Sequence, residues 1–551
     1  MKAAAQSPAG TPATRRSLLL AAVCCLIGLL GLALLGPAVA VLTTYRATGS
    51  RPASSGPAGV AITERLVLVV LSGVGNVVLE EGGDPWRFVQ LRRLAGEGAY
   101  GTVRAIQPSG DAPTWAALLS GADPAATGIV DVEEADPPAV PTLFDHGRSV
   151  GVRSLVIASR AAWQPRSRLA VPDETLLVPS SAAVAEMAAG SLSTPGKSLA
   201  VVLLDAGRVS GIRAVERWAR LDGQIASIAA ALDPARDTLI VTSDHGLLPD
   251  GSSGGGEAAL VNLPLVMWGR GIVPGRQSLR DQLDVAPTIA LLLGLPYGAG
   301  GGRPMFDALR LDAASNARER VRLLEARMAA SAPSGEQAAE ALVSARRALD
   351  QQDWPAAIRA AEQGLVELSR ASRPAAVWTS EWLWGAAVPL ALVILALLLA
   401  RLPRKRRLLV PLAGLEAYLL AWALIYFGLA AKPLSLSAVY GEWSANLLNI
   451  AVWSAVALAA MAIGMGLYRA KAGTWAAAER TGWSTVFILV SLAVFAVLSL
   501  LVAGPSGERL PGLGAWTAVL LALAQVTGTG LAAPVAMALA AMIAEIVGRG
   551  R

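Results

Sequence analysis

The stretch "TLIVTSDHGLLPDG" (238–251) runs from apolar residues directly into Ser-Asp-His-Gly. Thr238 to Thr242 has the pattern of a buried strand, and Asp244 and His245 follow where that strand would end. His245 is one of only two histidines in the 551 residues. A carboxylate beside an imidazole is a ligand pair that divalent transition metals accept. The stretch therefore predicts either a metal-binding pair at a strand end or a polar turn.

Other apolar runs of strand length alternate with amphipathic stretches such as 215–232, which is apolar at helical spacing. Apolar strands that alternate with helices are typical of a mostly parallel sheet covered by helices on both faces. The sequence thus predicts an α/β domain. The expected strands are 65–71, 151–158, 198–204, 238–242 and 263–268.

Polar residues occur at the ends of three of these strands: Ser72, Asp205, and Asp244 with His245. In open parallel sheets the ligand site lies outside the carboxyl ends of the strands, so these side chains could converge on one crevice. Each aspartate could instead cap a helix or a turn. Spacing alone favours capping.

Six segments give a further indication of the fold, because of the order in which they follow one another along the chain. Together they resemble the alkaline phosphatase superfamily, in particular the type I phosphodiesterase/nucleotide pyrophosphatase group with its membrane-bound phosphoethanolamine transferases. The resemblance covers about residues 64–310 and implies an alkaline-phosphatase-like α/β fold. The segments are "LVLVVLSGVG" (66–75), "PSGDAPTWAALLSGADPAATGI" (108–129), "VVLLDAGRVSG" (201–211), "SDHG" (243–246), "NLPLVMWGRGI" (262–272) and "DQLDVAPTIALLLGLP" (281–296).

The resemblance implies two metal ions, often zinc, and a Thr or Ser nucleophile that attacks phosphoesters. The nucleophile position falls on Asp111, two residues before Pro113. One metal site would keep Asp205, while Val209 and Ser253 stand at the positions of its other ligands. We therefore expect that this first metal site is lost.

The second metal site implied by the resemblance would consist of Ser72, Asp111, Asp244 and His245. Two carboxylates, an imidazole and a serine could hold one divalent ion, such as Zn²⁺ or Mn²⁺. The favoured hypothesis is nonetheless a pseudoenzyme, a binding or scaffolding module without catalysis, which would need no metal. The alternative is a one-metal phosphodiesterase, phosphatase or phosphoryl-group transferase that acts on envelope lipids or glycans. His146 is expected to be an ordinary surface or turn histidine.

The remaining chain predicts a membrane domain, because 54% of all residues are hydrophobic and the apolar residues gather in long runs. The expected spans are 17–42, 384–401, 408–430, 444–468, 483–503 and 513–547. The last contains Gly-Thr-Gly (528–530) and Pro534, so it could be one kinked helix or a broken one. The expected organisation is a cytoplasmic N-terminus (1–16), an anchor (17–42), a linker (43–63), the α/β domain (64–310), a helical hairpin or spacer (311–375) and a five-helix membrane domain (380–547).

The basic residues orient these spans. They gather in alternate loops, for example Arg15 with Arg16 and the run 401–407. Placing all basic loops in the cytoplasm requires six spans with both termini inside and residues 43–380 outside. "TRRSLLL" (14–20) also resembles a twin-arginine export signal, with Ala38-Val39-Ala40 as a cleavage site. The length of the apolar stretch favours an uncleaved anchor.

Residues 338–371 resemble one tetratricopeptide-like helical hairpin. One repeat cannot bury its apolar face alone, so the hairpin must pack on the α/β domain or on a protein partner. The net charge of +6 is explained by the membrane-flanking loops, so no nucleic-acid partner is expected. The expected partners are the lipid bilayer, an envelope phospholipid or glycan, and a protein on the hairpin.

Overall fold

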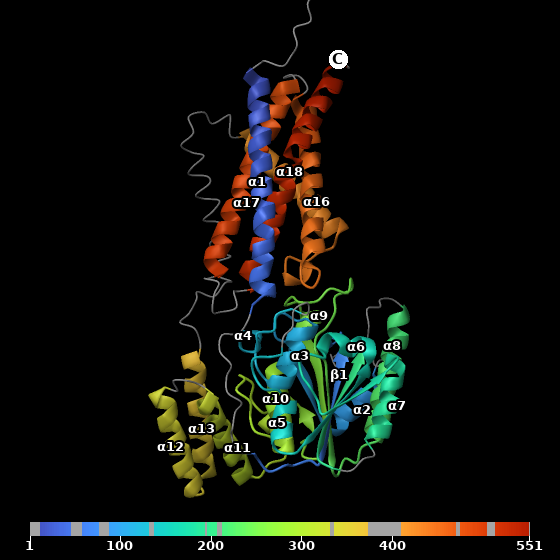
Figure 1. Ribbon diagram of the computed structural model, residues 1–551, viewed down its shortest axis with the longest axis vertical. Coiled ribbons are helices and arrows are strands. Elements are labelled where there is room, and N and C mark those ends of the chain that lie inside the picture. Colours follow the sequence, from blue (N-terminus) through green and yellow to red (C-terminus); the bar gives the residue numbers. More distant parts are fainter. Residues whose placement is uncertain are drawn as a thin grey trace, which may run out of the picture. The chain divides into compact units, whose positions relative to one another are not determined.

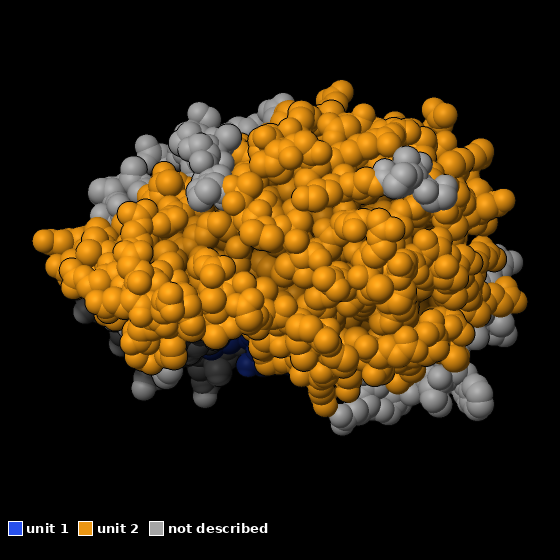
Figure 2. All heavy atoms as spheres, turned by 90° about the horizontal axis from the view of Figure 1, so that it is seen from below, with its two compact units in different colours: residues 1–42, 377–507, 511–551 blue, residues 43–376, 508–510 orange. Residues whose placement is uncertain are grey.

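The computed structural model describes residues 12–45, 58–76, 88–131, 137–192, 196–205, 212–330, 335–372, 409–469, 474–503 and 513–549. The chain forms two compact units, coloured separately in Figure 2. One unit comprises residues 43–376 and 508–510, and the other comprises residues 1–42, 377–507 and 511–551.

In the part of the first unit that the structure describes, nine strands form one sheet with β1 near its centre. β1 pairs in parallel with β5 and β6, and β3 pairs in parallel with β4 and β5, whereas β7 is antiparallel to both β2 and β6. The strands are β1 (Arg65–Ser72), β2 (Ala99–Arg104), β3 (Arg153–Ser159), β4 (Glu174–Val178), β5 (Ser198–Asp205), β6 (Asp237–Thr242), β7 (Asn262–Gly269), β8 (Gly275–Arg276) and β9 (Arg280–Asp281). The predicted mostly parallel sheet is thereby confirmed.

Helices cover both faces of the sheet, and Figure 1 shows α3, α5 and α10 on one side and α7 and α8 on the other. Successive side chains of β1 point to opposite faces, so Leu68 joins one core and Val69 joins the other. The helices are α2 (Val89–Glu97), α3 (Asp111–Ser120), α4 (Pro124–Thr127), α5 (Leu143–Ser149), α6 (Arg160–Trp163), α7 (Val184–Ser191), α8 (Ile212–Ala230), α9 (Ala258–Val261) and α10 (Val285–Leu293). Both faces of β1 are therefore apolar, as a central strand requires.

Three further helices, α11 (Ala313–Ala330), α12 (Glu336–Asp350) and α13 (Trp354–Ser372), follow the sheet. Ala345 of α12 and Leu365 of α13 belong to the same buried core as Trp115 of α3. Arg303 adds an ion pair to Glu362 of α13, with Nη1 3.0 Å from Oε2. The hairpin formed by α12 and α13 thus packs on the α/β domain.

Within its described residues, the second unit contains five helices long and apolar enough to cross a membrane. They are α1 (Pro12–Thr43), α15 (Leu409–Ala423) with its π-helical continuation Leu424–Leu429, α16 (Trp443–Arg469), α17 (Thr474–Ala503) and α18 (Leu513–Arg549). The chain is therefore a membrane protein by the length and composition of these helices. The predicted span 384–401 lies outside the described residues.

The Gly-Thr-Gly segment lies within α18, which is one helix. A Cβ on Gly530 would lie 2.5 Å from Gly28 Cα, and a Cβ on Gly528 would overlap the Ala451 carbonyl oxygen. Thr529 Oγ1 lies 3.0 Å from the Tyr418 hydroxyl. The two glycines therefore permit close backbone approach of α18 to α1 and to α16, as small residues do in membrane bundles.

Candidate functional site

Three strand ends are aligned at one edge of the sheet. Ser72 at the end of β1 is the pairing partner of Asp205 at the end of β5, and Gly73 bridges Gly246 beyond β6. This register brings Ser72, Asp205 and Asp244 to the carboxyl edge, where ligand sites of such sheets occur.

Asp111 joins this edge as the first residue of α3. Gly110 before it is extended, and a carboxylate in the first turn interacts favourably with the helix dipole. Oδ1 of Asp111 lies 2.8 Å from Nε2 of His245. Asp111, Asp244 and His245 each offer a ligand atom within 4.8 Å of the others, so three side chains of metal-ligand type lie together.

Arg166 completes this cluster and was not found from the sequence. It ends a short 3-10 helix (Gln164–Arg166) after α6, and its side chain is 3% exposed. A single nitrogen, Nη2, lies 2.5 Å from Asp111 Oδ1 and 2.8 Å from Asp244 Oδ2. The same nitrogen lies 2.9 Å from Ser72 Oγ. We refer to Ser72, Asp111, Arg166, Asp244 and His245 as the arginine cluster.

Two contacts fix the arginine in place. Nη1 donates to the carbonyl oxygen of Ala162 at 2.9 Å. The guanidinium carbon lies 5.8 Å from the ring centroid of Trp115, which is within cation–π range. Trp115 in turn packs edge-to-face against Trp163, with 6.0 Å between ring centroids. The guanidinium is thereby held against α3 and aimed at the strand ends.

Both oxygens of the Asp244 carboxylate accept hydrogen bonds. Oδ1 accepts from the backbone N–H of His245 at 2.8 Å and of Gly73 at 3.4 Å. Oδ2 accepts from Ser72 Oγ at 3.0 Å and from Arg166. Asp244 is fully buried, so its charge depends on these four donors.

His245 has a hydrogen-bond acceptor at each ring nitrogen. Nδ1 lies 2.8 Å from the carbonyl oxygen of Gly246, while Nε2 faces the Asp111 carboxylate. Only the imidazolium form donates from both nitrogens. Burial lowers the pKa of His245, but the charge of Asp244 and the bond to Asp111 outweigh it and raise the pKa to about 9.

Asp111 and Arg166 are also held charged. Burial disfavours the Asp111 carboxylate, but the Arg166 charge and the His245 hydrogen bond hold its pKa well below the usual range. Burial likewise disfavours the guanidinium, whose pKa is raised by Asp111, Asp244 and Asp205. Two carboxylates and two cations therefore neutralise each other within the arginine cluster.

The other predicted ligand positions are less closely connected. Asp205 lies at the strand edge and acts on Arg166 through its charge. Val209 lies outside the described residues. Ser253 precedes Gly254, whose backbone bridges Ser109, but within the described ranges no side-chain hydrogen bond joins Ser253 to the cluster. The structure thus brings together Ser72, Asp111, Asp244 and His245, and not Ser253.

A divalent ion does not fit the arginine cluster as it stands. Nη2 of Arg166 already lies between the two carboxylates, and Nε2 of His245 points its proton at Asp111. A metal ligand must be deprotonated, and arginine cannot lose its proton in proteins. Ligand-type residues are present, but their lone pairs are turned toward cations of the chain itself.

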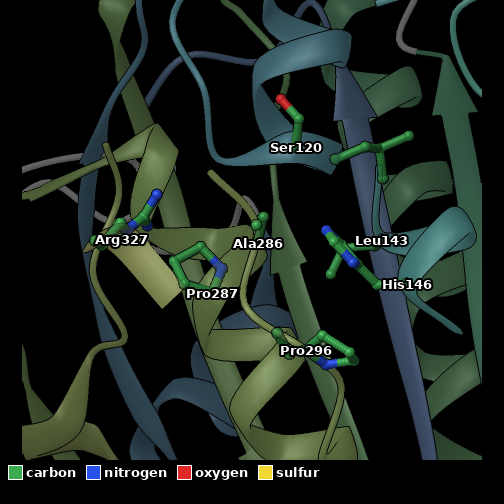
Figure 3. Close-up of a pocket in the computed structure, with 10 residues that line it drawn as sticks. Ser120, Leu143, His146, Ala286, Pro287, Pro296 and Arg327 are labelled. Atoms are coloured by element: carbon green, nitrogen blue, oxygen red, sulfur yellow. The ribbon is translucent and has the colours of Figure 1, made fainter. Parts of the chain in front are cut away.

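His146 is not the surface or turn histidine that the sequence predicts. It lies on α5 and is only 5% exposed. Among the described residues Nε2 has no hydrogen-bond partner, and it borders a small pocket that Arg327 lines on the other side (Figure 3). Burial lowers the pKa of His146. The sequence places it correctly before β3 but cannot show that the ring is turned inward.

No family model matches the chain, and no curated protein matches it. Among solved structures it is similar to an alkaline phosphatase superfamily protein from Vibrio parahaemolyticus, with 14% identity, a TM-score of 0.36, and coverage of 55% of this chain and 80% of the other. It is also similar to murine ectonucleotide pyrophosphatase/phosphodiesterase 5, with 12% identity, a TM-score of 0.35, and coverage of 42% and 95%. A putative sulfatase from Bacteroides thetaiotaomicron has 15% identity, a TM-score of 0.35, and coverage of 42% and 71%.

Proposed function

We propose that the chain is a membrane-anchored protein whose alkaline-phosphatase-like domain lies outside the cytoplasm and is catalytically degenerate, a binding or scaffolding module. The observation that carries this proposal is the state of Asp111 at the nucleophile position. Its carboxylate is bound by the Arg166 guanidinium and by His245. A carboxylate held by two cations is a weak nucleophile, because attack would require both ion pairs to weaken.

The neighbouring hydroxyls offer no replacement nucleophile. Ser72 Oγ donates to Asp244, Ser109 Oγ donates to the Gly255 carbonyl at 2.7 Å, and Thr114 Oγ1 donates to the Gly110 carbonyl at 2.6 Å. All three side chains are buried. A nucleophilic hydroxyl needs a base that takes its proton, and His245, the histidine of this cluster, has acceptors at both nitrogens.

A second function is favoured by one observation. The ligand atoms of Asp111, Asp244 and His245 lie within 4.8 Å of one another, which is close enough for one ion if Arg166 moved aside. This supports the alternative of a one-metal phosphodiesterase, phosphatase or phosphoryl-group transferase, with an envelope phospholipid or glycan as substrate. The two functions predict opposite results in a turnover assay.

The assay uses the full chain in lipid nanodiscs, with 4-nitrophenyl phosphate, bis(4-nitrophenyl) phosphate and 4-nitrophenyl sulfate, each with added Zn²⁺ or Mn²⁺ or with chelator. We expect no turnover above that of the His245→Ala variant under any condition. Metal-dependent turnover in the unmodified chain, lost in His245→Ala, would reject the degenerate module and support the alternative.

The proposed topology has six spans, both termini in the cytoplasm, and residues 43–380 outside. The alternation of basic and non-basic loops supports it. The test is labelling with a membrane-impermeant maleimide in intact cells, after replacement of Cys24 and Cys25 by serine. Ser227→Cys, at an exposed position, should be labelled, and Ser7→Cys should be labelled only after permeabilisation. The reverse pattern would contradict the topology.

A further inference from the structure

The arginine cluster is organised around one cationic nitrogen. Arg166 Nη2 contacts an oxygen from each of three separate segments: Ser72 at the end of β1, Asp111 at the start of α3, and Asp244 after β6. The three distances lie between 2.5 and 2.9 Å. A bound metal cation is typically surrounded in this way, by oxygens from several segments of the chain. Here the positive charge belongs to a side chain of the protein itself.

The carboxylates need such a cation. Asp244 is fully buried, Asp111 is partly buried, and their ligand oxygens lie within 4.8 Å of each other. Like charges in a buried site repel one another, and an unpaired buried charge is strongly destabilising. His245 offsets one charge by its contact with Asp111. Asp244 lies farther from His245, with 4.0 Å between Oδ1 and Nε2, so Arg166 is its closer cation.

We propose that Arg166 is a built-in substitute for a divalent cation. Its guanidinium takes the place between Asp111 and Asp244 that an ion would need, so the protein is metal-free as folded. Removal of this side chain creates a metal site from Asp111, Asp244 and His245. The inference rests on the proposed function and deepens it, because it identifies Arg166 as the group that occupies the cation position of the degenerate site.

The chemistry of the opened site follows from its donors. Without Arg166, Oδ1 of Asp111 and Oδ2 of Asp244 each lose the guanidinium contact and can face a metal. His245 can release its Nε2 proton to solvent and bind through the lone pair, as metal-ligating histidines do. Two carboxylates and one imidazole, with water at the open positions, suit Zn²⁺ or Mn²⁺.

The experiment compares the full chain in nanodiscs with Arg166→Ala, Arg166→Met, and the double variant Arg166→Ala/Asp244→Ala. Each protein is incubated with Zn²⁺ or Mn²⁺ and desalted. Bound metal is measured by mass spectrometry, and the thermal unfolding midpoint with and without metal is measured in parallel. Arg166→Met is included because its unbranched side chain can still fill the space against Trp115.

We expect no stoichiometric ion in the unmodified chain and a midpoint that does not respond to metal. At least one of the two single variants should bind one ion per chain and unfold at a higher temperature when metal is present. The double variant should bind none. A single variant that folds only with metal present would meet the same expectation.

Two results would overturn the inference. One is a stoichiometric ion bound by the unmodified chain. The other is the absence of metal binding by both single variants, whether they fold or stay unfolded with metal present. Because the readout is bound metal, the outcome is separate from turnover. An unmodified chain that turns over substrate without metal would reject the proposed function and leave this inference intact.

Discussion

Nε2 of His245 lies 2.8 Å from Oδ1 of Asp111, although the two residues are 134 positions apart in the chain. The contact joins the third residue beyond β6 to the first residue of α3, and it carries charge because the second ring nitrogen also donates. The imidazolium is therefore part of the folded structure, and its proton is coupled to stability.

This coupling predicts a loss of stability at alkaline pH. The folded pKa of His245, about 9, is raised above its ordinary value of 6.5. The stabilisation of the folded state by protonated His245 is thus fully present below about pH 6.5 and is lost as pH rises through about 9. We expect the thermal unfolding midpoint of the full chain to fall across this window. His245→Gln should remove that part of the pH dependence, and an unchanged slope in this variant would contradict the assignment.

Asp244→Ala is expected to destabilise the protein by about 3–5 kcal/mol, because it removes one of the two carboxylates that pair with the buried Arg166 and leaves an excess positive charge in the arginine cluster. The matched control is Glu64→Ala, which removes one partner of the Glu64–Arg236 ion pair, where both side chains are more than half exposed. That change should leave the unfolding midpoint nearly unchanged, since exposed ion pairs contribute little. Equal effects of the two substitutions in thermal unfolding would contradict the buried pairing of Arg166.

Gly530→Leu should weaken the packing of α1 against α18, because a Cβ at Gly530 would lie 2.5 Å from Gly28 Cα and 2.7 Å from the Cys24 carbonyl oxygen. Overpacking of this kind costs about 1–3 kcal/mol. The control is Gly514→Leu on the same helix, where a Cβ would meet nothing within 4 Å. The measurement is the unfolding midpoint in detergent, and a fall of the same size in both variants would argue against the close crossing.

The first span should remain in the mature protein. Trp516 Nε1 donates to the carbonyl oxygen of Ala38 at 2.9 Å, and Gly28 packs against Gly530. Loss of α1 would expose these small-residue surfaces of α18 and leave the indole donor without its acceptor. Intact mass of the purified protein should therefore include residues 1–42. A mature N-terminus directly after Ala40 would support the cleaved twin-arginine signal instead.

Some elements of the α/β domain were not predicted, for identifiable reasons. β2, "AYGTVR", contains Ala and Gly, which have little preference for strands, and it is specified by its pairing with β7. β4 lies at the edge of the sheet, where its exposed residues lack a continuous apolar run. α11 was expected only as part of a helical region and is fixed by the core that it shares with α13.

The sequence by itself determined the buried strands, their alternation with helices, five apolar helices, and the placement of Asp244 and His245 after β6, because these depend on patterns within short windows. Arg166 was decided only by the tertiary structure. It is 55 positions from Asp111 and 78 from Asp244, and an isolated arginine in a short 3-10 helix has no local pattern that marks it. Arg166 can pair with the carboxylates only where α3, α6 and the strand ends meet. A buried charge needs counter-charges close by, and here distant segments of the chain supply them.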